Sequence, residues 1–171
     1  GLVFSRLTSY YPEQNNPFSN RLKIVNEADY LSDILHKCKT VKEVKEHIER
    51  YDHSFFLNDV FIYIDSLGDY LIVEPYKLIE GNNPNYVLAN FCPSITDNKQ
   101  ARKLERYRNG EDFLQTNKAN ASIDFCTKLS DTMSVCRKRN GDGTLITSIF
   151  HTNEKIVSLY FYHNFDSLIQ Y

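Results

Sequence analysis

The chain has 171 residues, a formal net charge of -2 and 42% hydrophobic residues, values ordinary for a globular protein of one domain. They exclude a disordered, collagen-like or coiled-coil chain, and the interspersed charges give no electrostatic reason to expect a nucleic-acid partner. Charged or polar residues interrupt every apolar stretch well before the about 18 residues that a membrane span needs, so we also expect no membrane partner.

The first part of the chain predicts a strand, a loop and two helices, over residues 2–9, 10–25, 26–37 and 40–51 in that order. The second helix has the clearer start, because Thr40 and Glu43 are spaced as a capping box. Neither helix contains residues that suggest chemistry.

The middle of the chain predicts β-structure. Residues 55–65 and 69–79 are apolar on both faces and are separated by Ser66–Leu67–Gly68, which favours a hairpin. Strands of this kind must be covered on both faces. A third strand is predicted over residues 85–91.

The last part of the chain predicts two helices and a second hairpin. The first helix covers about 97–116 with an interruption at Asn109–Gly110, and the second covers about 121–137. The second helix places one apolar stripe toward the core, formed by Cys126, Leu129, Met133 and Cys136. A turn at 140–143 leads into the hairpin 144–151 and 155–162. This order of elements indicates an α+β fold with helices outside antiparallel sheets.

Motifs for known chemistry are absent from the sequence. We find no phosphate-binding, dinucleotide-binding, zinc-protease, serine-hydrolase or kinase motif. The four cysteines form no CxxC pair, and no two of the five histidines share a helical face at i, i+4. We therefore expect neither a metal nor a cofactor.

The middle segment carries a resemblance to a known family. Residues 58–74, NDVFIYIDSLGDYLIVE, resemble the "N…D-x-x-G-x-x-x-V-x-E" hairpin of the linear amide C–N hydrolases, the choloylglycine hydrolase and penicillin acyltransferase-like group. Four further segments resemble motifs of this family in the same order along the chain: 40–48, 87–91, 104–107, and 147–150 together with 157–162.

The resemblance implies an αββα sandwich, in which two antiparallel sheets lie between helical layers, as in N-terminal nucleophile hydrolases. It implies an amide hydrolase or acyltransferase that acts on a small-molecule N-acyl amine. In that family an N-terminal Cys attacks the amide carbonyl, and its own amino group acts as general base. The residues that match the rest of the family's site are Asn90, for the oxyanion, and Arg106, which keeps the nucleophile poised.

The sequence departs from the family pattern at its start. The family's nucleophile lies upstream of a motif that this chain matches from Gly1–Leu2 onward. We therefore interpret residues 1–171 as a single domain that is the C-terminal portion of a larger αββα domain, lacking its N-terminal part. An N-terminal fragment of the same protein is then a candidate partner, and the chain alone should not catalyse the reaction. The start of the chain, which is not Met, does not indicate a compartment.

Each candidate residue also has a purely structural interpretation. Asn90 could cap a turn, and helical periodicity places Arg106 in solvent. Cys92 has no local His or acid and is interpreted as a packing residue rather than a nucleophile. Glu74 is expected to close the hairpin or to pair with a base on a helix. At the level of the whole chain, the rivals to an enzyme are a degenerate family member that binds a ligand or partner, and a structural domain with an accidental similarity.

Overall fold

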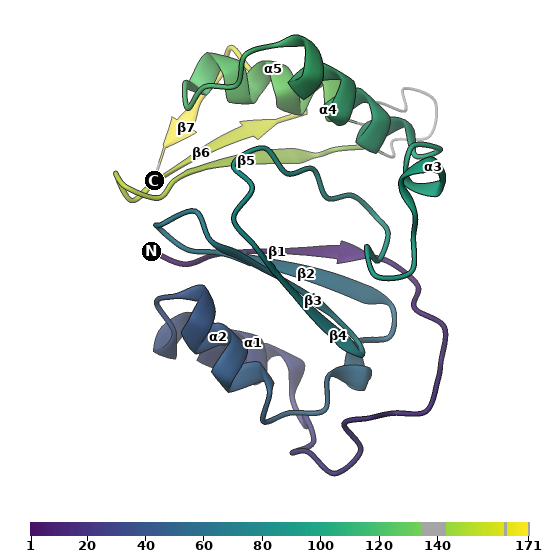
Figure 1. Ribbon diagram of the computed structural model, residues 1–171. Coiled ribbons are helices and arrows are strands. Elements are labelled where there is room, and N and C mark those ends of the chain that lie inside the picture. Colours follow the sequence, from purple (N-terminus) through teal and green to yellow (C-terminus); the bar gives the residue numbers. More distant parts are fainter. Residues whose placement is uncertain (135–142, 163, 171) are drawn as a thin grey trace. The chain divides into compact units, whose positions relative to one another are not determined.

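The computed structural model describes residues 1–134, 143–162 and 164–170. The chain forms two compact units, one from Gly1–Pro84 and Asn90–Thr96, the other from Asn85–Ala89 and Asp97–Tyr171. Each unit combines an antiparallel sheet with helices, which confirms the predicted α+β class (Figure 1). That the whole chain is a single domain stays a prediction.

The first sheet places its strands in the order β1, β2, β3, β4, with all neighbours antiparallel. Their bounds are Val3–Thr8, Asp59–Ile64, Tyr70–Glu74 and Lys77–Gly81. The predicted hairpin is present as β2 and β3, in shorter form. The chain before β2 forms a short 3-10 helix, η1 (His53–Phe56), where the strand was expected to begin.

Both predicted helices of the first unit are present as α1 (Glu27–Lys37) and α2 (Val41–Ile48). The Asn26 side chain accepts a hydrogen bond from the backbone N–H of Asp29, and Thr40 and Glu43 form the predicted capping box. The two helices run along one face of the sheet (Figure 1), where Ile34, Val44 and Ile48 are buried.

The core of this unit lies between the two helices and the sheet. Phe61 pairs with Val73 and Tyr63 with Leu71 across β2 and β3, so these four side chains share the face that meets the helices. Val60 and Ile72 point to the opposite face and are also fully buried. The burial of both faces confirms what the apolar pattern of these strands predicts.

The second unit contains three described helices and a sheet of the order β5, β6, β7. The helices are α3 (Asn98–Ala101), α4 (Glu105–Thr116) and α5 (Ile123–Met133), and the strands are β5 (Ile146–His151), β6 (Ile156–Phe161) and β7 (Ile169–Gln170). The predicted final hairpin is confirmed as β5 and β6. Helix α4 packs on α5, where the rings of Phe113 and Phe125 lie 5.3 Å apart.

The predicted strand over 85–91 is wrong, because β4 takes the place beside β3. Pro75 and Tyr76 form a two-residue connection that turns the chain back immediately after Glu74. Proline has no N–H to donate to a sheet ladder, so the predicted strand 69–79 could not continue through Pro75. The chain from 85 to 91 is instead irregular.

The predicted interruption at Asn109–Gly110 is also wrong. The helical segment breaks before α4, where Leu104 has an extended backbone, and α4 then runs through Gly110. A Cβ at Gly110 would lie 2.8 Å from Met133 Sδ, so the glycine permits close packing of α4 on α5 rather than a break.

The predicted apolar stripe of the helix 121–137 is only partly present. Helix α5 ends at Met133, and within it Phe125 is the buried residue while Cys126 is half-buried. Cys136 and most of the turn expected at 140–143 lie outside the described residues. Helix α5 packs on β5, whereas α2 packs on β2 and β3.

Candidate functional site

Asn90 lies in the first unit, where it contacts the end of β1. Its Nδ2 donates a hydrogen bond of 2.9 Å to the carbonyl oxygen of Thr8, the last residue of that strand. The side chain is exposed, so it is accessible to a ligand. The bond to Thr8 fixes the orientation of the amide group, which is a requirement for an oxyanion donor.

Arg106 lies in the second unit, as the second residue of α4, and its side chain is half-buried. A positive charge in the first turn of a helix is unfavourable next to the positive end of the helix dipole. Helix stability alone therefore does not explain an Arg at this position. Because Asn90 and Arg106 belong to different units, their convergence on one site stays a prediction.

The segment after Asn90 is held to the chain that follows β1 by contacts at alternate residues. Cys92 Sγ lies 3.3 Å from Ser9 Oγ, and Ser94 Oγ lies 3.2 Å from the hydroxyl oxygen of Tyr11. Cys92 and Ser9 are buried. A turn closes the segment, because Ile95 N–H donates to the carbonyl oxygen of Cys92 across Pro93.

Glu74 is the last residue of β3, and its side chain contacts this segment at Ser94. It pairs with Lys77 next to the turn of the β3–β4 hairpin, and not within the β2–β3 hairpin that it was expected to close. The side chain is 1% exposed, and Oε1 accepts the backbone N–H of Ser94 at 2.9 Å. Its other oxygen, Oε2, has no hydrogen-bond partner among the described residues. Burial raises the pKa of this carboxyl, and the hydrogen bonds from Ser94 only partly oppose that shift.

Cys92 is a poor nucleophile in this environment. The pKa of its thiol is raised to about 11, chiefly by burial; the hydrogen bond with Ser9 opposes this shift, and the neighbouring Glu74 adds to it. Since the thiolate is the reactive form, the thiol is unreactive near neutral pH. Burial also raises the pKa values of Cys38 and Cys126. None of these three described cysteines is therefore activated.

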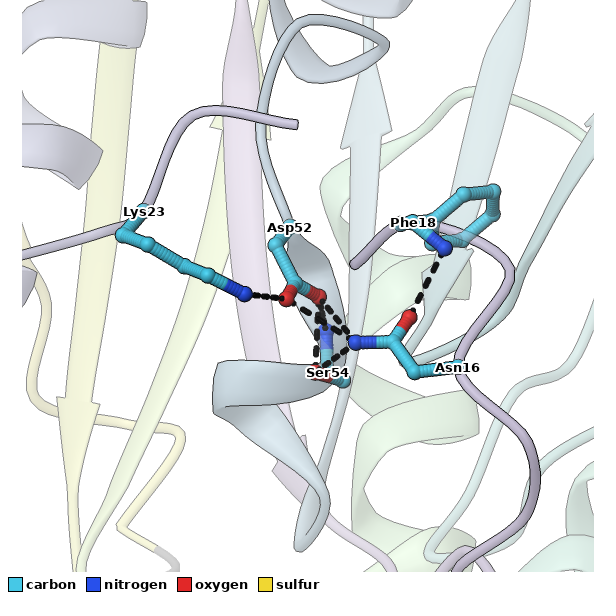
Figure 2. A network of polar contacts seen from close by, with 5 residues as sticks. All are labelled: Asn16, Phe18, Lys23, Asp52 and Ser54. Carbon is cyan, nitrogen blue, oxygen red and sulfur yellow. Dashed lines mark hydrogen bonds and ion pairs between the residues drawn. The ribbon is translucent and has the colours of Figure 1, made fainter. Parts of the chain in front are cut away.

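A second polar network surrounds Asp52, and Figure 2 shows how its members converge. The Asp52 carboxylate accepts hydrogen bonds from the Asn16 side chain, from Lys23 Nζ at 2.6 Å, and from both the backbone N–H and the hydroxyl of Ser54. Burial acts to raise the pKa of this carboxyl, but the hydrogen bonds outweigh it and lower the pKa to about 2. A carboxylate so fully bonded anchors the loop before α1 and is not poised for acid–base chemistry.

The buried histidines belong to the core of the first unit. His53 Nε2 lies 2.6 Å from the Tyr30 hydroxyl, and burial lowers the pKa of His53 to about 3. A histidine with this pKa is neutral at physiological pH. Its position among the rings of Tyr30, Phe56 and Phe61 gives it a packing role.

Two cavities among the described residues lie away from Asn90 and Arg106 in the sequence and are lined by other side chains. A cavity of about 490 Å³ lies where the start of α2 meets the β2–β3 turn and the end of β4, with Thr40, Asp65 and Glu80 in its wall. Another, of about 260 Å³, lies beside the β5–β6 turn, with Cys126 and His151 in its wall. Among the described residues no three acidic, His or Cys side chains are grouped to hold a metal ion, and no helix is long and apolar enough to cross a membrane.

Sequence reasoning identified Asn90, Glu74 and Cys92 but missed the partners that hold them, which are Thr8, Ser9, Tyr11 and Ser94. The sequence does contain one local signal, the alternation of polar or small residues at 90, 92 and 94. That alternation indicates one side of an extended segment but does not say what it faces.

Comparison with solved structures identifies proteins of the same fold. A mutant conjugated bile acid hydrolase from Clostridium perfringens superposes with a TM-score of 0.68 at 15% sequence identity, over 99% of this chain and 69% of that chain. Penicillin V acylase from Agrobacterium tumefaciens gives a TM-score of 0.62 at 16% identity, over 95% of this chain and 60% of that chain. The chain thus spans less than two thirds of the acylase.

No protein-family model and no curated protein sequence matches the chain. At 15% and 16% identity the similarity establishes a shared fold. The fold of these two proteins, by name a conjugated bile acid hydrolase and a penicillin V acylase, agrees with the one that the family resemblance implies.

Proposed function

We propose that this chain forms part of an amide C–N hydrolase or acyltransferase that acts on small-molecule N-acyl amines. The observation that carries the proposal is the similarity of fold along nearly the whole chain to a bile acid hydrolase and a penicillin acylase. The motifs quoted above add to it, because they follow the family's order along the chain. Fold alone does not assign an activity, which depends on the side chains of the site.

Asn90 and Arg106 are the residues of this chain to which we assign roles. Asn90 is exposed and its amide is oriented by Thr8, which suits a donor to the oxyanion that forms when a nucleophile adds to an amide carbonyl. Arg106 provides a permanent positive charge, suited to holding a thiolate or a carboxylate by paired hydrogen bonds.

The nucleophile in this proposal comes from a part of the protein outside this chain. The three described cysteines all have raised pKa values, which supports that assignment. An incoming thiolate would bond to the amide carbon, and the amine would leave with a proton. Water would then release the acid, or a second amine would accept the acyl group.

The test compares this chain with the complete protein that carries it. Both are incubated with penicillin V and with conjugated bile salts, and the released acid and amine are measured by mass spectrometry. We expect turnover by the complete protein and none by the chain alone. If the complete protein binds these compounds without cleaving them, the proposal fails in favour of a non-catalytic binding module. Hydrolysis by the chain alone that is lost in Cys92→Ala would also contradict it.

Arg106 has a test of its own in the complete protein. Arg106→Ala should lower kcat strongly, and Arg106→Lys should restore only part of it, because lysine lacks the two-pronged geometry of a guanidinium. Lys103→Ala is the control, since Lys103 is an exposed cation three residues earlier. Equal activities of Arg106→Ala and Lys103→Ala would reject the role.

A further inference from the structure

We propose that Glu74 is a positioning residue, which holds the segment of residues 90–94 against the chain that follows β1 and so orients Asn90. The inference rests on the proposed function, because it assigns to Glu74 the task of supporting the oxyanion donor. Glu74 itself is not proposed to contact the substrate.

Three side chains tie the segment to the end of β1 from one side. Asn90 bonds to Thr8, Cys92 contacts Ser9, and Ser94 contacts Tyr11. No strand ladder supports the segment, since it has no β-structure. Its position therefore depends on side-chain contacts.

Glu74 connects the same segment to the sheet by a hydrogen bond. Its side chain shares the face of Tyr70 and Ile72, opposite to the face that α1 and α2 cover. The bond from Ser94 N–H to Glu74 Oε1 connects the turn at Pro93 to the fully buried end of β3. Because the end of β3 is buried in the core, Glu74 has a fixed position. The turn that it contacts begins at Cys92, two residues after Asn90.

A carboxyl is a costly group to bury, and this one has an oxygen without a partner in the described part of the chain. The raised pKa of Glu74 reflects the same cost. An apolar residue at this position would avoid the cost but would leave Ser94 N–H without its acceptor. The bond to Ser94 therefore accounts for a buried carboxyl here.

The kinetic consequence follows from the geometry of oxyanion stabilisation. Donors act at about 2.7–3.1 Å from the developing charge. A small displacement of Asn90 therefore reduces the stabilisation of the transition state more than it reduces the affinity for substrate. Loss of Glu74 should accordingly lower kcat and leave KM nearly unchanged.

The first experiment measures position without relying on activity. In the isotopically labelled complete protein, NMR follows the Ser94 backbone amide and the Asn90 side-chain amide. Glu74→Ala should raise the hydrogen-exchange rate of Ser94 by at least about tenfold and shift the Asn90 signals, while amides in β2 keep their protection. Glu74→Gln, which keeps an acceptor oxygen, should resemble the wild type. The control is Glu80→Gln on the neighbouring strand β4.

Three results would overturn the inference. One is an unchanged Ser94 amide in Glu74→Ala, and another is an equal loss of protection in Ser94 and in β2, which would indicate general destabilisation. Failure of Glu74→Gln to restore the Ser94 signal also contradicts it, because the acceptor oxygen is then not what matters.

The second experiment measures turnover by the same variants. We expect Glu74→Ala to lower kcat at least about tenfold with KM within about twofold, and Glu74→Gln to recover most of the loss. A matching fall in kcat for Glu80→Gln would reject the specific role of Glu74. If the wild-type complete protein has no turnover, the proposed function fails, while the NMR signals still decide whether Glu74 positions the segment.

Discussion

At the scale of single residues, the carboxylate of Asp52 joins three separate pieces of the first unit. Asn16 comes from the loop before α1, Lys23 from the approach to that helix, and Ser54 from η1 (Figure 2). The Asp52 side chain is 4% exposed, whereas that of Lys23 is 64% exposed. The bonds to Asn16 and Ser54 therefore contribute more to stability than the ion pair, which solvent weakens.

We predict that Asp52→Ala lowers the free energy of unfolding by about 2–3 kcal/mol, since it leaves the half-buried donors of Asn16 and Ser54 without their acceptor. Asp52→Asn should lose less, because it retains one acceptor oxygen. Urea unfolding measures both. Asp33→Ala, which removes only an exposed pair with Lys37, is the control and should leave stability nearly unchanged. A loss in Asp52→Ala no larger than in this control would show that the network is incidental.

His53 makes the stability of the protein depend on pH. Its pKa is about 3 in the folded protein, against about 6.5 in an unfolded chain. The unfolded state therefore binds more protons below pH 6.5, and stability falls as the pH is lowered from 6.5 toward 3. Burial lowers the pKa of His47 as well, which acts in the same direction.

We predict that the wild type loses about 2 kcal/mol of unfolding free energy through His53 between pH 7.5 and pH 5. Over this range Asp52 stays ionised in both states, so it does not contribute. His53→Gln should be less stable at pH 7.5 but should lose distinctly less on acidification. Urea midpoints at several pH values give the comparison. Parallel pH profiles for the two proteins would refute the assignment.

At the scale of elements, one carboxylate links a helix start to a hairpin turn. Asp65 follows β2, and its Oδ2 accepts the backbone N–H of Val41 at 3.0 Å while Oδ1 accepts that of Leu67 at 2.9 Å. Val41 N–H belongs to the first turn of α2, where backbone donors have no partner within the helix. Asp65 therefore fixes α2 on the sheet and shapes the β2–β3 turn together.

Asp65→Ala should destabilise the protein by about 2–3 kcal/mol, because two backbone donors lose their acceptor at once. The matched control is Asp69→Ala in the same turn, whose exposed side chain leaves the backbone bond from Asp65 N–H to the Asp69 carbonyl intact. Thermal or urea unfolding distinguishes the two. Equal effects of the two substitutions would mean that the turn, and not the link to α2, accounts for the loss.

The elements that sequence predicts well are those whose causes lie within a few residues. The capping box of Thr40 and Glu43 and the β5–β6 hairpin were predictable because spacing and alternation determine them locally. The strand expected at 85–91 was wrong because Pro75 already ends β3 and β4 occupies the adjacent position. That outcome depends on which segment pairs with β3 in the folded sheet, and the local sequence pattern does not determine this pairing.

The same reason limits prediction of the candidate site. Asn90, Arg106 and Glu74 could be selected from motif resemblance, but the contacts of Asn90 with Thr8 and of Glu74 with Ser94 span 82 and 20 residues. Such contacts follow from the fold and have no signature in the nearby sequence. Cys92 was predictable as a packing residue because no activating group lies near it in sequence, and its burial agrees with that interpretation.

At the scale of the whole molecule, the fold is shared with a conjugated bile acid hydrolase and a penicillin V acylase although only 15% and 16% of residues are identical. A fold of this kind persists when core positions stay apolar and of similar volume, whereas activity depends on a few polar side chains. In the proposed function one such side chain is Asn90, which we propose to be a donor to the oxyanion in the complete protein.

Steady-state kinetics of Asn90→Ala in the complete protein tests this claim most directly. Asn15→Ala is the matched control, because Asn15 is an exposed asparagine of the same unit. The account predicts that Asn90→Ala lowers kcat by about 10²–10³-fold with KM nearly unchanged, and that Asn15→Ala has wild-type kinetics. A kcat for Asn90→Ala equal to that of Asn15→Ala would contradict the account.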